Sequence, residues 1–143
     1  MSLSWEMLNL ELIRNLGIPS LIVGILYFFI VKPYHLYYNF RDYLTKSAMK
    51  HSSTILNTGL PSEEYKETFN ELNEWLGEMN VLKNRLKLNE YLSFLGIPSD
   101  DELQEAIENT AFMRNALGRQ KYFVDSYHKY NRLMEIFNIN QPK

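Results

Sequence analysis

The stretch Leu16–Val31, LGIPSLIVGILYFFIV, restricts most strongly what this chain can fold into. Its only frankly polar side chain is Ser20, and Tyr27 is amphipathic. A helix of these 16 residues would be about 24 Å long, against about 30 Å for the hydrocarbon core of a bilayer. Downstream, Lys32 can reach the interface, and three tyrosines suit an aromatic belt: Tyr34, Tyr37 and Tyr38. We interpret the stretch as a transmembrane helix.

The apolar stretch has two other interpretations. A fully buried core helix has the same composition, but the rest of the chain is too small to wrap it completely. A cleavable signal peptide would need a basic start and a small-residue cleavage site, whereas Glu6 and Glu11 outnumber Arg14 and Lys32-Pro33 follows. We therefore favour membrane insertion.

The orientation of the helix follows from lysine and arginine alone. Arg14 stands before the stretch, whereas Lys32, Arg41, Lys46 and Lys50 follow it. The positive-inside rule then predicts a single-pass protein of the inner (cytoplasmic) membrane, with its N-terminus outside and its C-terminal domain in the cytoplasm. The chain has no cysteine, which suits a reducing compartment and excludes disulfides and thiolate metal sites.

The expected fold class is all-α, an N-terminal transmembrane helix followed by a small cytoplasmic helical bundle. With 143 residues, the chain has room for one such domain. We expect residues 1–33 to form the anchor, 34–138 the bundle and 139–143 a frayed tail. The net charge of −2 makes nucleic acid an improbable partner.

Helix boundaries can be placed from three Gly-[Ile/Leu]-Pro-Ser tetrapeptides, which punctuate helices. Predicted helices run from Pro33 to about Leu56, over 62–86, briefly over 89–95, over 100–117, and over 120–138. Ser99 and Glu102 form a predicted capping box. Pro33 should bend the chain or sit in a first turn. The 62–86 helix has a heptad-like apolar seam, suited to an antiparallel neighbour or to a copy of itself.

No pattern of residues points to catalysis, a cofactor or a metal. The three histidines, His35, His51 and His128, pair with no other ligand type at helical spacing. Nucleotide-binding loops and nucleophile elbows are lacking. The carboxylates gather where helix N-termini favour them, which explains them better than acid–base catalysis does. We expect a protein that is not an enzyme.

Two groups of residues are candidate interaction sites. Basic residues interleaved with tyrosines could hold an anionic ligand or a lipid headgroup: Arg114, Arg119, Lys121, Lys129 and Arg132. The alternative, which we favour, is a solvated face that compensates the acidic helices 61–75 and 100–108. In the anchor, Gly17, Ser20 and Gly24 share one face that lets helices approach closely. Together with helix 62–86, this face predicts a homo-oligomer.

Residues 68–118 carry a resemblance to known proteins. Phe69–Glu78 (FNELNEWLGE), Leu92, Gly96–Ala106 (GIPSDDELQEA) and Asn115–Leu117 are similar to segments of a loose group of uncharacterised bacterial single-pass membrane proteins. These share one N-terminal spanning helix, a lysine–proline junction like Lys32-Pro33 and a helical cytoplasmic domain. The resemblance implies an architecture and a bacterial setting, and it supplies no activity and no site residues.

Three functional hypotheses remain at this point. The favoured one is a membrane-anchored interaction or oligomerisation module without catalysis, whose partners are the bilayer, copies of itself and a candidate protein partner. The second is an oligomeric membrane effector or sensor, for stress response or phage defence, whose cytoplasmic domain answers a trigger and perturbs the bilayer. The third and weakest is a soluble all-α enzyme built around a buried central helix.

Overall fold

The computed structural model describes residues 17–56, 62–88 and 90–139. One continuous helix comprises α2 (Ile18–Leu26), the π-helical turn η2 (Tyr27–Val31) and α3 (Lys32–Ile55). It is followed by α4 (Ser62–Leu86), the 3₁₀ segment η3 (Glu90–Leu95), α5 (Asp100–Asn115), the 3₁₀ turn η4 (Gln120–Tyr122) and α6 (Phe123–Ile136). These ranges contain no strand, which confirms the all-α prediction for the described part of the chain.

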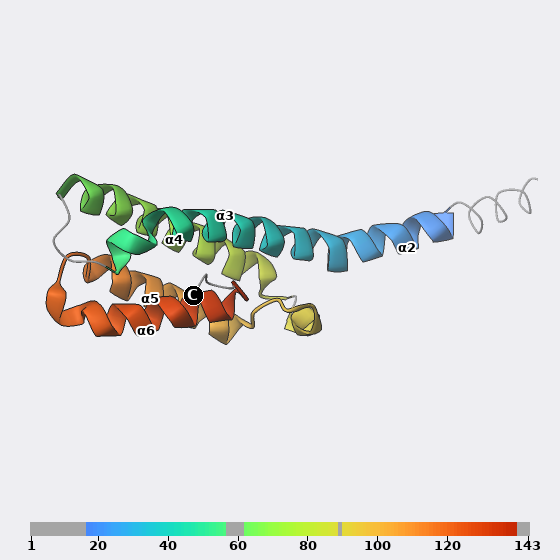
Figure 1. Ribbon diagram of the computed structural model, residues 1–143. Helices are drawn as coiled ribbons and strands as arrows, with labels where there is room; N and C mark the ends of the chain where they lie inside the picture. Colours follow the sequence, from blue (N-terminus) through green and yellow to red (C-terminus); the bar gives the residue numbers. More distant parts are fainter. Residues whose placement is uncertain (1–16, 57–61, 89, 140–143) are drawn as a thin grey trace, which may run out of the picture.

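The helices α3 to α6 form a four-helix bundle in which neighbours in sequence are neighbours in space (Figure 1). The short connections force each helix to run antiparallel to the one before it. The end of α6 returns to the start of α3, where the rings of Tyr37 and Phe137 stack with centroids 6.2 Å apart. In contrast, α2 projects away from the bundle, so one part of the long helix packs in the bundle and the other part extends beyond it.

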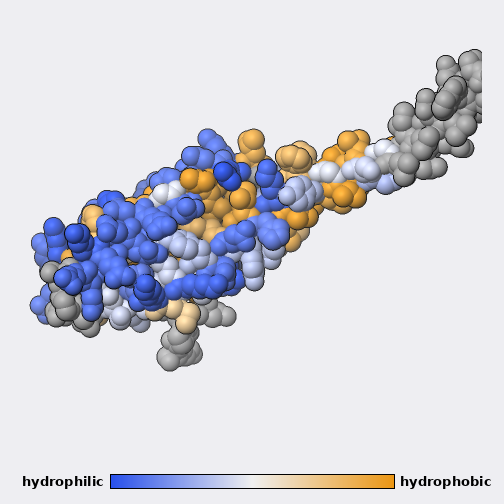
Figure 2. Space-filling model, turned by 90° about the horizontal axis from the view of Figure 1, so that it is seen from above, coloured by the Kyte–Doolittle hydropathy of each residue, from blue (hydrophilic) through white to orange (hydrophobic). Residues whose placement is uncertain are grey.

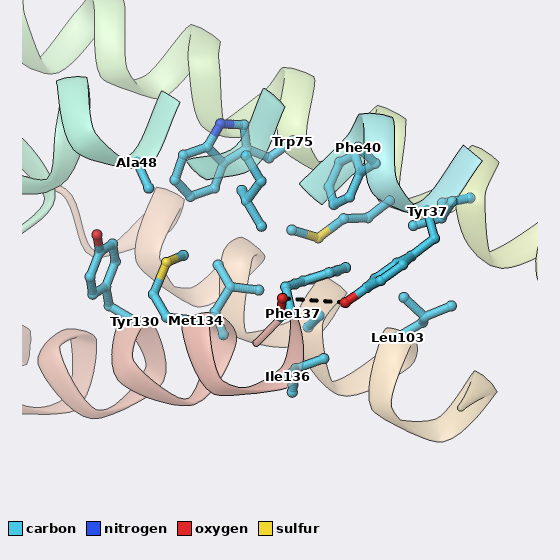
Figure 3. Packing of buried hydrophobic residues seen from close by; sticks show 14 of the residues in the cluster. Tyr37, Phe40, Ala48, Trp75, Leu103, Tyr130, Met134, Ile136 and Phe137 are labelled. Atoms are coloured by element: carbon cyan, nitrogen blue, oxygen red, sulfur yellow. Dashed lines mark hydrogen bonds between the residues drawn. The ribbon is translucent and has the colours of Figure 1, made fainter. Parts of the chain in front are cut away.

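The bundle core is made of aromatic, leucine and methionine side chains from all four helices (Figure 3). Trp75 of α4 and Phe137 at the end of α6 are completely buried. Phe137 also lies 5.2 Å from the ring of Phe40, measured between centroids. Tyr37, which the sequence also suggested for the membrane belt, is 4% exposed and belongs to this core.

The apolar seam of the 62–86 helix is largely buried inside the bundle. Four of its members, Leu72, Met79, Leu82 and Leu86, are at most 4% exposed. They are buried because α4 lies between α3 and α5: Trp75 donates a hydrogen bond to Ser47 of α3, and Thr110 of α5 lies 3.5 Å from the sulfur of Met79. These side chains of the seam therefore pack on antiparallel neighbours within the bundle, which is one of the two alternatives; the other was a copy of the same helix.

Both ends of α5 are fixed as their residue types require. At the start of α5 the predicted capping box is confirmed: Ser99 Oγ accepts from Glu102 N–H, and the Glu102 carboxylate accepts from Ser99 N–H, each at 3.2 Å. After α5, Gly118 takes a φ of +74°, in the left-handed region that glycine enters without strain.

At the end of α6, Asn138 has a φ of 54° and the backbone closes a Schellman motif, in which Ile139 N–H donates to Met134 O at 2.8 Å. Arg41 of α3 then donates to the carbonyls of Phe137 and Asn138, at 2.8 and 2.6 Å. Ile139, expected in the frayed tail, instead packs on the core. Residues 140–143 of that tail lie outside the described residues.

Candidate functional site

The most distinctive surface is the projecting part of the long helix, residues 17–31, here called the apolar segment. No residue of α2 or η2 is buried. Apart from Ile30, which is partly buried against the bundle core, the large side chains are exposed on every side, from 43% at Val31 to 65% at Val23. Figure 2 shows the apolar colour extending along this rod, beyond a largely hydrophilic bundle. Of the described residues, one helix, Ile18–Ile55, is long and apolar enough to cross a membrane.

The exposure of the apolar segment bears on whether it is a transmembrane helix or a buried core helix. In the most apolar 18-residue window of the long helix, the mean hydropathy is 1.4 and only 6% of the residues are buried. A core helix of a soluble protein is enclosed by its own fold. The bundle leaves this helix uncovered, so it is not a helix buried at the centre of this chain's own fold.

The junction between the apolar segment and the bundle is shaped by Pro33. Proline has no backbone N–H, so the carbonyl four residues earlier, Phe29 O, lacks its usual α-helical donor. The helix accommodates the proline with the π-helical turn Tyr27–Val31, in which Lys32 N–H donates to Tyr27 O. Of the two expected roles, Pro33 takes the second: it lies in the first turn of α3, directly after this local change of helix type, and the helix continues through it.

A side chain from the bundle reaches the carbonyl of Phe29. The hydroxyl of Tyr91, in η3, donates to Phe29 O at 2.7 Å, across 62 positions of sequence. This contact ties η3 to the base of the apolar segment. Neither residue could be paired from the sequence, because a proline predicts which carbonyl loses its donor but not which side chain replaces it.

The small residues predicted for the anchor lie on an open surface. Gly17, Ser20 and Gly24 are all exposed. A methyl group added at Gly24 would meet no atom within 4 Å. The packing of this chain therefore gives no reason for glycine at position 24.

The five predicted basic residues do not converge on one site. Arg114 and Arg119 line a hollow of about 510 Å³ with Lys66, Tyr65 and Phe69. Arg114 donates to Asn73 Oδ1 at 2.8 Å and lies 5.9 Å from the Phe69 ring centroid. The hollow is at the end of the bundle formed by the start of α4 and the end of α5, opposite the apolar segment (Figure 1).

The other three basic residues make contacts within the bundle. Lys121 lies 4.8 Å from the ring centroid of Tyr122, and Lys129 lies 5.0 Å from that of Phe112. Arg132 forms a bidentate ion pair with Glu105 of α5, at 3.0 to 3.1 Å, and this contact raises its pKa. Arg132 thus compensates the acidic helix 100–108, as the alternative interpretation of the basic residues expects.

A polar network joins α3 and α4, and the sequence does not predict it. From the sequence alone, Glu71 is one of several carboxylates near the start of a helix. Glu71 Oε1 accepts from Ser47 Oγ at 2.6 Å and from Tyr43 Oη at 2.8 Å, and Trp75 Nε1 donates to Ser47 Oγ at 2.7 Å. One turn further along, His51 Nδ1 lies 3.2 Å from Thr68 Oγ1, both buried. The spacing of the histidines, which gave no support to a metal site, does not predict Thr68 as the partner of His51.

The network makes stability depend on pH. Burial alone would raise the pKa of Glu71, but the hydrogen bonds from Ser47 and Tyr43 and the nearby His51 outweigh it, so the pKa lies below its ordinary 4.5. A lowered folded-state pKa stabilises the fold above pH 4.5, and this contribution is lost as the pH falls through the folded value. We expect Glu71→Gln to cost more stability at pH 7 than at pH 3, measured by urea unfolding. An equal cost at both pH values would contradict this role.

Comparison with known proteins returned no match: no family model fits the chain, and no curated protein or solved structure is significantly similar to it. The loose resemblance noted from residues 68–118 stays an expectation. Within the described ranges, no three acidic, histidine or cysteine side chains are grouped so that they could hold a metal ion. The geometry of the apolar segment is therefore the strongest guide to function.

Proposed function

We propose that this chain is a single-pass membrane protein whose apolar segment crosses the bilayer and holds the helical bundle at the cytoplasmic surface. The bundle serves there as an interaction or oligomerisation module without catalysis. One observation carries the proposal: the helix from Ile18 to Phe29 exposes large apolar side chains around its whole circumference. In water such a surface is unfavourable, whereas in lipid tails it costs nothing.

The residues just after the apolar segment suit the edge of a bilayer. Lys32 folds back so that its ammonium lies 5.0 Å from the ring centroid of Phe28, at the point where the apolar run ends. Tyr34 and Tyr38, both exposed, stack with centroids 6.2 Å apart in the next turns. A lysine that can reach the headgroups and a pair of surface tyrosines are typical of the membrane–water interface.

Association of the anchors is the second part of the proposal. The face formed by Gly17, Ser20 and Gly24 offers close approach to another helix, which lipid-embedded helices use because packing and not the hydrophobic effect drives them together. The seam of α4 is largely engaged within its own bundle, so we assign self-association to the anchor.

Alkaline carbonate extraction of membranes from cells that express the full chain tests the anchoring. The chain should stay in the membrane pellet, because carbonate strips proteins held by surface contacts and leaves those embedded in lipid. A parallel wash in concentrated salt identifies electrostatic attachment. Recovery of the chain in the carbonate supernatant would contradict the proposal.

A further inference from the structure

We infer that η3 forms a second contact with the bilayer, in which Leu88, Tyr91 and Phe94 enter the boundary between headgroups and acyl chains beside the apolar segment. These three residues are here called the η3 patch. The inference rests on the proposed function, since it requires the apolar segment to be embedded. It adds a lipid-binding surface on the bundle itself, about 60 residues further along the chain.

The η3 patch presents unusually exposed apolar side chains on a fixed support. Leu88 is 88% and Phe94 75% exposed, more than any other large apolar side chain of the described residues, and Tyr91 is 50% exposed. Between them Leu92 is 1% exposed and joins the core, and Leu95 packs against it. Because Leu92 is held inside, the segment cannot turn its neighbours inward. An apolar surface this prominent indicates a contact partner.

The position of the η3 patch favours lipid as its contact partner. Tyr91 Oη donates to Phe29 O at 2.7 Å, so Tyr91 lies beside the last turn of the apolar segment. Figure 1 places η3 (yellow) at the end of the bundle from which α2 projects. When the apolar segment is embedded up to Lys32, η3 has to meet the same bilayer surface. The patch thus continues the surface of the anchor.

The chemistry of the Tyr91–Phe29 contact supports the same depth. A carbonyl without a donor is costly where no water can replace the missing bond, and Pro33 removes the usual donor of Phe29 O. A tyrosine has an apolar ring that tolerates lipid and a hydroxyl that can satisfy the carbonyl. Tyr91 is therefore the residue type that this boundary requires.

Charged side chains near the η3 patch also suit a bilayer that contains anionic lipid. Arg85 and Lys87 are exposed at the end of α4, directly before Leu88. Two nearby acids already have partners: Glu90 Oε1 accepts from Asp100 N–H at 3.4 Å, and the Asp100 carboxylate pairs with Lys83 at 3.8 Å. Basic residues that flank apolar ones are typical of segments that lie in the interface.

Fluorescent labels test the inference, because the chain has no cysteine and each label needs only one substitution. Three full-length variants carry the environment-sensitive dye NBD: Phe94→Cys in the η3 patch, Ile22→Cys in the apolar segment and Val124→Cys on α6. Val124 is 62% exposed in the first turn of α6, and α6 begins at the end of the bundle opposite the apolar segment (Figure 1), so this position is the matched control. The proteins are reconstituted in vesicles of phosphatidylcholine and phosphatidylglycerol that carry a nitroxide either high or deep on the acyl chain.

The label at residue 94 should emit further to the blue than the label at 124, and the shallow nitroxide should quench it more than the deep one. Quenching at 22 but not at 94 would overturn the η3 contact and leave the anchor intact. A blue shift at 94 without quenching by either nitroxide would show that the label contacts protein and not lipid. That result would also overturn the η3 contact. Absence of quenching at 22 would overturn the proposed function itself.

Discussion

Replacing Trp75 by alanine should lower the free energy of unfolding by about 3–5 kcal/mol, as is typical for the loss of a buried aromatic side chain. Trp75 is completely buried between α3 and α4. Its indole N–H donates to Ser47, which in turn donates to Glu71, so the change opens a cavity and breaks a hydrogen-bonded chain. Urea unfolding of the detergent-solubilised full chain, followed by far-ultraviolet circular dichroism, measures the loss.

Two further variants separate the causes of this loss. Trp75→Phe keeps most of the ring and removes the donor, so it should cost less, with about 1–3 kcal/mol from the Ser47 oxygen, which loses its donor. Met49→Ala, at a position on α3 that is 71% exposed, should change the free energy of unfolding by less than about 0.5 kcal/mol. If Trp75→Ala were as mild as Met49→Ala, the bundle core would be wrongly assigned.

The double variant Ile22→Arg/Ile25→Arg should release the chain from membranes. Each arginine near the middle of a spanning helix costs about 2.5–3.5 kcal/mol, so the pair costs about 5–7 kcal/mol. That cost corresponds to a change of more than about 1,000-fold in the partition between membrane and water. Both isoleucines are about half exposed and have no role in the bundle, so the bundle itself should keep its helical content. Carbonate extraction measures the outcome.

The matched control for this variant is Met49→Arg/Val124→Arg. It makes the same kind of change at two exposed positions of the bundle, so overall charge and hydropathy shift by a similar amount. This control should remain in the carbonate pellet. If both double variants behaved alike, net charge would explain the result, and the apolar segment would have no special role.

Local signals in the sequence predict most helix positions. The helices expected from Pro33 to Leu56 and over 62–86 appear as Lys32–Ile55 and Ser62–Leu86, because their ends carry glycine, proline and capping residues. The helix expected to reach 117 ends at Asn115, and Gly118 then turns the chain. These features depend on neighbouring residues only.

What the sequence does not reveal depends on contacts between distant residues. Arg41 was counted as a charge for membrane orientation, yet it caps the end of α6, 96 positions away. Glu71 was assigned to the helix dipole, yet it collects hydrogen bonds from α3. The basic residues from Arg114 to Arg132 share a sequence window but separate in space, because α5 and α6 run in opposite directions around a turn. No pattern along one helix predicts such pairings.

The most direct test of the membrane placement is the accessibility of a spin label at Val23, the most exposed large apolar residue of the apolar segment, in vesicles that contain the full chain. Collision rates with oxygen, which concentrates in lipid, are compared with those of a water-soluble nickel chelate. We expect oxygen to dominate at residue 23 and the chelate to dominate at Val124. A label at 23 that collides with the chelate as often as a label at 124 would contradict the transmembrane assignment.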